Sequence, residues 1–337
     1  MKFDFIIGNP PYQEDAIGDN KNFAPPVYYR FMDEVYCIGD KVELIHPARF
    51  LFNAGATPKE WNRKMLNDPH FKVVYYEPKS GNVFSGPDIK GGVAITYRNN
   101  SIDYGELETF TAFNELNSIL NKVKPFLNEV GSIEKIIFLQ NKFNLDVLNE
   151  AIPDLNRTDK RLESSIFELS VFTKERIFED DYKILGLIKN KRVFRYINKK
   201  FIDTSYAGNL FKYKVMLPKS NGSGTLGEVL STPLIGQPLI GYTRSFMGIG
   251  AFNSLDEAEA ALKYIKSKFA RVMLGVLKIT QDNPPKTWKY VPLQDFTEKS
   301  DIDWSQSIAG IDRQLYKKYG LDEKEITFIE THVKEMS

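Results

Sequence analysis

The sequence predicts an α/β fold for residues 1–100, then a mixed α+β region and a helical tail. In the first region, short runs of β-branched and aromatic residues alternate with helix-like segments, with Pro and Gly between them. Beyond residue 130 the alternation stops, and glycines crowd residues 221–250. A chain of 337 residues is long enough for two or three domains, each with its own core.

Each element of the first region follows from its pattern. We predict, in order, a strand at residues 3–7, a helix at 27–38, a strand at 42–46, a helix at 59–66 and strands at 73–77 and 93–97. Pro47 ends the second strand because proline lacks an N–H for the sheet ladder. A polar helix at 106–128 then separates this region from the next.

The second region gives weaker signals. Candidate strands lie at residues 133–139, 165–172, 182–189, 193–198 and 213–217. Residues 255–277 predict a long amphipathic helix or a helix pair. Helices at 304–319 and 323–333, separated by Gly320 as a stop signal, form the tail. The domain boundaries that follow are 1–128, 129–300 and 301–337.

Composition excludes several classes of protein. A net charge of +1 gives no support to DNA binding from overall charge, although it permits a basic face. The single Cys37 excludes a disulfide scaffold and fits a reducing cytoplasm. Three scattered histidines predict no metal site. The chain has neither an apolar run of about 18 residues nor a signal peptide, so we expect a cytoplasmic protein without a membrane span.

The most informative motif is Asn9-Pro10-Pro11-Tyr12, directly after the first strand. An asparagine oxygen and a backbone carbonyl can accept two N–H bonds, and a tyrosine ring can stack on a flat base. The position after a strand favours a site, because ligands of α/β sheets bind at the carboxyl ends of strands. The plainer alternative is a turn that two prolines enforce.

Residues Gly8 to Tyr12 resemble the catalytic motif of the adenine (amino) DNA methyltransferases. Residues 42–51 and 82–95 resemble the segments that follow it in that family. Phe84 matches the family's aromatic residue that packs against the far face of the extruded adenine; alternatively it fills the domain core. Lys90, before two glycines, could let the backbone approach a phosphate, and a tight turn explains those glycines equally well.

The second half is similar to the target-recognition region of restriction–modification methylases of the Eco57I type. The matching segments are residues 236–246, 257–271, 278–282 and 300–321. The resemblance implies a partial Rossmann-like methyltransferase sheet of about four strands, S-adenosyl-L-methionine as cofactor and double-stranded DNA as partner. In that reaction Asn9 and the Pro10 carbonyl would hold the amino group of a flipped adenine.

The cofactor loop of this family is missing from the sequence. It lies upstream of the catalytic motif, whereas here the motif begins at residue 9. The one Gly-x-Gly-x-x-Gly, residues 222–227, opens no helix and is not expected to bind a cofactor. We therefore expect the C-terminal part of a methyltransferase without its cofactor-binding half. Residues 3–7 would then form an apolar edge strand, covered by the rest of a longer enzyme, another subunit or a second copy.

Candidate DNA contacts come from two places. Lys191, Arg192 and Arg195 belong to a basic stretch in a predicted hairpin, with Phe194 and Tyr196 between them. Such a ribbon can follow phosphates, or it can be an ordinary solvated hairpin. Tyr242 and Arg244 are the other candidates for contact with DNA, since arginine is the commonest reader of guanine edges and Tyr242 lies close to it in the sequence.

Two other functions fit parts of the sequence. A non-catalytic DNA-recognition module would keep the second half with a vestigial pocket. A bifunctional restriction enzyme fragment would add a nuclease, for which Asp154, Asp181 and Lys183 give a loose acidic–acidic–lysine pattern. That pattern is permissive and needs structural context.

Overall fold

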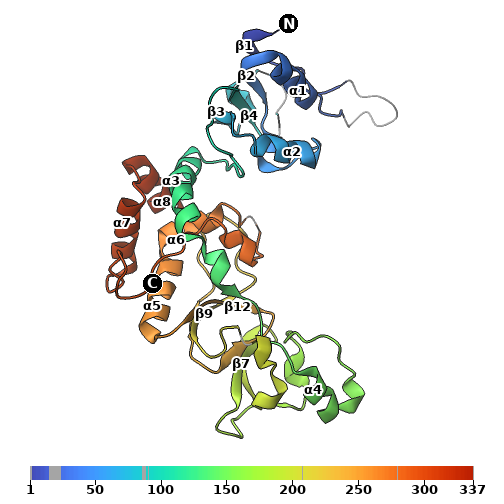
Figure 1. Cartoon of the computed structure of the whole chain (residues 1–337), viewed down its shortest axis with the longest axis vertical. Coiled ribbons are helices and arrows are strands. Elements are labelled where there is room, and N and C mark those ends of the chain that lie inside the picture. Colours follow the sequence, from blue (N-terminus) through green and yellow to red (C-terminus); the bar gives the residue numbers. More distant parts are fainter. Residues whose placement is uncertain are drawn as a thin grey trace. The chain divides into compact units, whose positions relative to one another are not determined.

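A computed structural model describes residues 2–14, 24–85, 89, 91–206, 208–278 and 280–336. The chain divides into two compact units, residues 1–117 and 118–337, and the division falls inside helix α3 (Asn114–Val130). Figure 1 labels the main elements of each unit.

Unit 1 contains every helix and strand predicted for residues 1–100. They are β1 (Phe3–Gly8), α1 (Tyr28–Ile38), β2 (Gly39–Pro47), α2 (Lys59–Leu66), β3 (Phe71–Glu77) and β4 (Val93–Asn99). Two 3₁₀ turns, η1 (Arg49–Phe52) and η2 (Ser80–Asn82), lie in the loops after β2 and β3. The α/β class is confirmed for this unit, whereas its correspondence to part of a methyltransferase sheet stays a prediction.

The sheet of unit 1 has the order β1-β2-β4-β3. β1 pairs parallel with β2, and β4 runs antiparallel to both β2 and β3. β1, β2 and β3 therefore point the same way, and the loops that follow them leave the sheet at one edge. In α/β sheets this carboxyl edge is where ligands bind.

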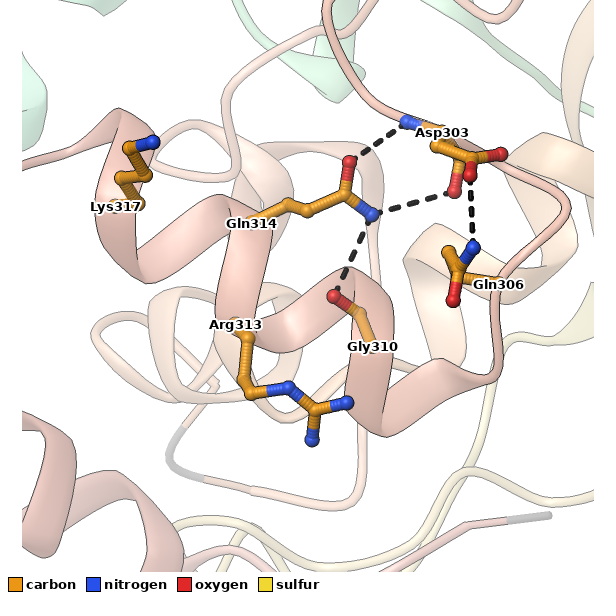
Figure 2. A pocket seen from close by; sticks show the side chains of 6 residues that line it. All are labelled: Asp303, Gln306, Gly310, Arg313, Gln314 and Lys317. Carbon is orange, nitrogen blue, oxygen red and sulfur yellow. Dashed lines mark hydrogen bonds between the residues drawn. The ribbon is translucent and has the colours of Figure 1, made fainter.

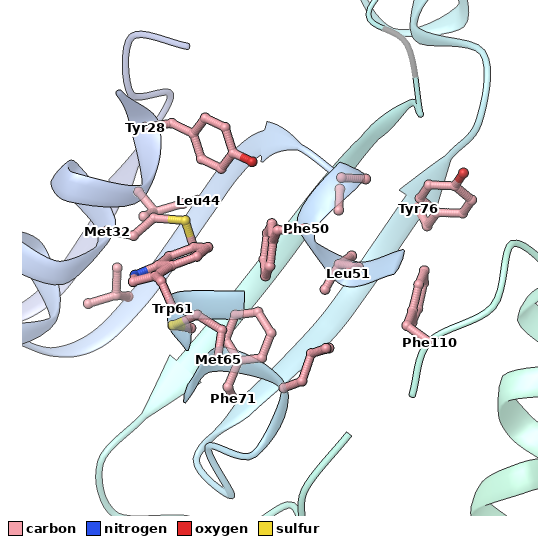
Figure 3. Packing of buried hydrophobic residues seen from close by; sticks show 14 residues of the cluster. Tyr28, Met32, Leu44, Phe50, Leu51, Trp61, Met65, Phe71, Tyr76 and Phe110 are labelled. Atoms are coloured by element: carbon pink, nitrogen blue, oxygen red, sulfur yellow. The ribbon is translucent and has the colours of Figure 1, made fainter. Parts of the chain in front are cut away.

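The core of unit 1 lies on one face of this sheet (Figure 3). Met32 of α1 and Trp61 and Met65 of α2 join Leu44 of β2 in one buried cluster, so both helices cover the same face. The fully buried Phe50 packs against Trp61 with ring centroids 4.9 Å apart. Burying each such side chain contributes about 2 kcal/mol or more.

The first strand leaves an apolar edge open, as the sequence predicts. β1 is the last strand of the sheet order and pairs on one side only. Ile6 packs against the core, whereas Phe5 and Ile7 point to the opposite face and are 64% and 81% exposed. An unpaired edge with exposed apolar side chains is a site for further pairing.

The described part of unit 2 contains two four-stranded sheets, with orders β10-β9-β12-β5 and β11-β7-β8-β6. Their strands are β5 (Ile137–Phe138), β6 (Phe172–Thr173), β7 (Tyr182–Ile188), β8 (Lys191–Ile197), β9 (Tyr213–Pro218), β10 (Leu234–Gly236), β11 (Ile240–Tyr242) and β12 (Phe246–Phe252). Its further helices are α4 (Leu145–Ala151), α5 (Leu255–Lys266), α6 (Lys268–Gly275), α7 (Ile308–Lys318) and α8 (Glu323–His332). The predicted helix pair at 255–277 is confirmed as α5 and α6.

Some predictions for unit 2 are wrong. Residues 165–172 contain a 3₁₀ turn and only the first residue of the short β6, and most of 133–139 is a 3₁₀ turn before β5. The glycine-rich segment contains strands β10 to β12, which were not predicted from the sequence. Its glycines make room for neighbours: a β-carbon on Gly248 would lie 2.4 Å from the Tyr242 hydroxyl oxygen.

The tail helices pack within unit 2. Tyr319, just after α7, stacks on Phe269 of α6 with ring centroids 4.6 Å apart. The Asp312 carboxylate accepts hydrogen bonds from the Lys268 and Phe269 N–H groups at the start of α6, at 3.0 and 2.9 Å. After α8, the Lys334 N–H donates to the Gly227 carbonyl at 3.0 Å, and the Arg271 guanidinium donates to the Lys334 carbonyl.

The open edge predicts self-association of the isolated chain. We expect sedimentation velocity to show mass rising with concentration, and Ile7→Lys to reduce it, because a charge on this face opposes edge pairing. Ile7 is 81% exposed, so the free energy of unfolding should change by roughly 0.5 kcal/mol or less. Ile177→Lys, at a residue of unit 2 that is 63% exposed, is the matched control. A wild-type chain that stays monomeric at every concentration contradicts the prediction.

Candidate functional site

The carboxyl edge of unit 1 brings two of the predicted site residues together. Tyr12 lies in the loop after β1 and Phe84 in the loop after β3, and their ring centroids are 6.5 Å apart with an interplanar angle of 67°. Both side chains are half-buried, while Asn9 at the end of β1 is exposed. The contact of the two rings thus joins the loop that begins with Asn9 to the loop after β3.

The backbone around Tyr12 is held by the start of α1. The Val27 N–H donates to the Tyr12 carbonyl at 3.1 Å, and the Glu14 N–H donates to the Pro25 carbonyl at 3.0 Å. The Tyr12 hydroxyl is buried without a hydrogen-bond partner among the described residues, and burial raises its pKa. A buried polar group without a partner is uncommon, so this hydroxyl is available as a donor to a bound ligand.

The loop that carries Phe84 closes on itself. The Phe84 N–H donates to the Ser80 carbonyl at 2.9 Å, and the Ser80 hydroxyl accepts the Ile89 N–H at 2.8 Å. Gly92 has φ +76°, and a β-carbon there would lie 2.3 Å from the Glu77 carbonyl oxygen. The tight-turn explanation for this glycine is therefore sufficient. Lys90, a predicted DNA contact, lies outside the described residues.

His46 forms part of the support beneath this edge. Its Nδ1 lies 3.1 Å from the Pro47 carbonyl oxygen and its Nε2 lies 2.7 Å from the Thr96 hydroxyl. The carbonyl can only accept, so we assign the proton to Nδ1, with Nε2 accepting from Thr96. Burial lowers the pKa of His46 to about 4, so the ring is neutral. Tyr28 stacks on it with ring centroids 5.8 Å apart.

The predicted basic hairpin exists, as β7 and β8. Its turn residues Lys189 and Asn190 have φ +48° and +61°, as two-residue hairpin turns require. Lys191 is exposed. The Arg192 guanidinium donates to the carbonyls of Ser231 and Thr232 at 3.2 and 2.6 Å, and burial lowers its pKa. Arg195 donates to the Phe194 carbonyl at 2.9 Å. A DNA role for these residues stays a prediction.

The expectation that Tyr242 contacts DNA is wrong. Tyr242 is 1% exposed, and its hydroxyl lies 2.9 Å from the Asn209 side-chain oxygen and 3.2 Å from the Phe138 carbonyl oxygen. It is a core residue that links three segments of unit 2. Arg244 is exposed and forms an ion pair with Glu163 at 3.0 Å, so its contact with DNA stays a prediction.

The glycine-rich loop at 222–227 is filled by the chain's own carboxylate. Glu228 accepts hydrogen bonds from the Ser223 and Gly224 N–H groups at 2.8 and 3.1 Å and pairs with Lys278 at 2.5 Å. Successive N–H groups of this kind often bind an external anion. Here Glu228 takes that place, which agrees with the expectation that the loop binds no cofactor.

Asp181, an acidic residue of the possible nuclease pattern, is hydrogen-bonded within a local turn. Asp181 is 2% exposed, and its carboxylate accepts from the Ile177 and Phe178 N–H groups at 3.1 and 2.9 Å. In the part of the chain that the structure describes, no three acidic, histidine or cysteine side chains form a group that could hold a metal ion. Asp181 therefore stabilises a turn.

Unit 2 has a polar hollow of about 370 Å³ beside α7 (Figure 2). It is lined by Asp303, Gln306, Gly310, Arg313, Gln314 and Lys317. The Gln314 amide bonds the backbone of Asp303 in both directions, at 2.8 and 3.3 Å, so it holds the loop before α7. The hollow thus has a structural explanation.

None of the described helices is both long and apolar enough to cross a membrane.

Comparison with known proteins finds a family match within unit 1. Residues 1–84, which include Asn9 to Tyr12 and Phe84, match the family model "Eco57I restriction-modification methylase". The chain is 28% identical over 146 residues to an "Uncharacterized adenine-specific methylase" of Mycoplasma pneumoniae (strain ATCC 29342 / M129 / Subtype 1), covering 41% of this chain and 34% of that protein. The predicted resemblance to Eco57I-like adenine methylases is thereby confirmed. The chain spans about a third of the length of this relative.

A solved structure with a weak overall likeness is that of the Type IIL restriction-modification enzyme MmeI in complex with DNA. The match covers 98% of this chain and 56% of that one, at 10% identity and a TM-score of 0.37. A likeness of this size carries no argument about function.

The buried His46 predicts a pH dependence of stability in unit 1. Its pKa is about 4 when folded against 6.5 ordinarily, so between these values the unfolded state binds more protons. Its contribution is complete above pH 6.5 and is lost as the pH falls toward 4, in total about 3 kcal/mol. Hydrogen exchange of the β2 peptide, compared at about pH 7 and about pH 5, should show this loss.

The variants separate His46 from other titrating groups. His46→Gln should flatten the pH dependence of β2 protection, whereas the control His70→Gln should keep it. An unchanged slope in His46→Gln would mean that another group carries the effect.

Proposed function

We propose that this chain is the C-terminal part of a site-specific DNA adenine methyltransferase of a restriction–modification system. It would transfer a methyl group from S-adenosyl-L-methionine to the amino group of a flipped adenine in double-stranded DNA. The observation that carries the proposal is the contact of Tyr12 with Phe84, in a segment that also contains the exposed Asn9 and that matches the methylase family. Unit 2 would provide target recognition.

The chemistry of the motif suits this reaction. The amino nitrogen of adenine is a weak nucleophile because its lone pair is delocalised into the ring. Hydrogen bonds from its two N–H groups to the Asn9 side-chain oxygen and the Pro10 carbonyl would localise the lone pair and fix its direction. Orientation and electrostatics lower the barrier here, without a general base. S-adenosyl-L-methionine would supply an electrophilic methyl group.

The two aromatic rings would hold the base from both faces. A base between parallel rings needs roughly 7 Å from ring to ring, twice the optimal carbon–carbon contact of about 3.5 Å. The Tyr12 and Phe84 centroids are 6.5 Å apart, but the rings meet edge-on at 67°. The spacing fits a base, and one ring must turn to accept it.

The cofactor half would come from outside the described residues. The glycine-rich loop at 222–227 holds Glu228 instead, so the described residues do not fit a cofactor loop of the expected kind. The open β1 edge offers a place for the missing half, whether it belongs to a longer enzyme, another subunit or a second copy. The alternative is a non-catalytic DNA-recognition module, which would need no cofactor half at all.

Calorimetry separates these possibilities. We expect the isolated chain to bind duplex DNA but to give no binding heat with S-adenosyl-L-methionine, with or without DNA, because the described residues form no cofactor loop of the expected kind. Binding heat from the chain alone would contradict the need for a separate half. Addition of that half should restore cofactor binding and methylation in a split enzyme, but not in a recognition module.

The role of the motif predicts the effect of Asn9→Ala. In the enzyme with its cofactor half, losing one acceptor for the amino group should lower the methylation rate about 10²–10³-fold, the usual cost of removing one catalytic hydrogen bond. Asn9→Asp keeps an acceptor and should retain part of the rate. Gln13→Ala, at an exposed neighbour in the same loop, is the control. Undiminished adenine methylation by Asn9→Ala would refute the assigned role.

A further inference from the structure

Arg49 lies at the carboxyl edge of unit 1 and has no role in the chemistry described above. It is the first residue of η1, and only Ala48 separates it from the end of β2. The next two residues, Phe50 and Leu51, are 0% and 1% exposed and belong to the core, whereas Arg49 is exposed. The core therefore fixes the backbone of Arg49 and turns its side chain toward solvent.

Two glycines make room for the Arg49 side chain. A β-carbon on Gly91 would lie 2.5 Å from Arg49 Cγ, and one on Gly55 would lie 3.3 Å from Arg49 Cβ. Both glycines have φ +87°, a conformation that other residues rarely adopt. The arginine stem thus lies between the loop after β2 and the loop after β3. Its direction is fixed by packing rather than by an ion pair.

No carboxylate of the described residues comes within 4.0 Å of the Arg49 guanidinium. Burial raises the pKa of the Tyr28 hydroxyl, and the positive charge of Arg49 opposes part of that rise. Tyr28 follows Val27, whose N–H bonds the Tyr12 carbonyl, and Gly91 lies in the turn that the Gly92 N–H closes on the Ile89 carbonyl, within the loop of Phe84. Arg49 is therefore a cation that packs against the loop of Phe84 at Gly91 and whose charge acts on Tyr28, next to the residue that holds Tyr12.

We propose that Arg49 binds a phosphate of the DNA backbone next to the target adenine. The inference rests on the proposed function. A flipped base rotates about its backbone, so the flanking phosphates stay at the mouth of the pocket while the base enters it. Arginine suits that position because its planar fork can donate two parallel hydrogen bonds to phosphate oxygens. Such a contact positions the nucleotide without reading its sequence.

The salt dependence of DNA binding tests this role. The probe is a fluorescent duplex with one adenine opposite an abasic position, which lowers the cost of extrusion. Each phosphate contact contributes about 0.9 to the slope of log K against log salt concentration. Arg49→Gln should reduce the slope by about 0.9, while Arg49→Lys, which keeps the charge, should retain it.

The control is Lys64→Gln, which removes a positive charge of α2 that is already paired with Asp33 at 2.8 Å. It should leave the slope at its wild-type value. An unchanged slope in Arg49→Gln, or an equal loss in Lys64→Gln, overturns the role of Arg49 while the proposed function stands. If the wild-type chain binds no DNA, the proposed function fails and this inference fails with it. Arg49 is exposed, so thermal unfolding should be unchanged in both Arg49 variants.

Discussion

Parallel pairing of β1 with β2, in register from Phe3 with Gly39 to Gly8 with Leu44, determines where Asn9 to Tyr12 leave the sheet. Because β3 runs in the same direction, the loops after all three strands meet at one edge. The Ala48 N–H donates a hydrogen bond to the Gly92 carbonyl at 3.0 Å, which joins the loop after β2 to the loop after β3. A shift of β1 by one residue would turn its side chains to the other face and remove the meeting of Tyr12 with Phe84.

The core beneath this edge keeps the geometry rigid at low electrostatic cost. His46 is neutral, and both of its ring nitrogens have hydrogen-bond partners, so no buried charge has to be compensated. Phe50 fills the space between His46 and Trp61, with centroid distances of 5.4 and 4.9 Å. Arg49, by contrast, is exposed beside this core, where DNA phosphates would supply the counter-charge.

The helices and strands of unit 1 could be predicted because each buries one face of its own, which leaves a periodic pattern in the sequence. Tyr12 and Phe84 could be proposed from motif resemblance. Arg49 could not, because an exposed arginine in a loop leaves no periodic signal. Strands β10 to β12 were missed because their glycines leave room for side chains that the local sequence pattern does not identify. Gly248, for example, leaves room for Asn209 and Tyr242. The prediction that Tyr242 contacts DNA was wrong for the same reason, because its burial depends on Phe138 and Asn209.

The bond between the Lys334 N–H and the Gly227 carbonyl joins the segment after α8 to the glycine-rich loop of unit 2. A β-carbon on Gly227 would lie 2.2 Å from the His332 carbonyl oxygen, so this glycine leaves space for the chain end to dock. Arg271 joins the same place from α6 through the carbonyls of Gly227, Glu228 and Lys334. The segment after α8 therefore helps to hold the glycine-rich loop in place, although the two lie far apart in the sequence.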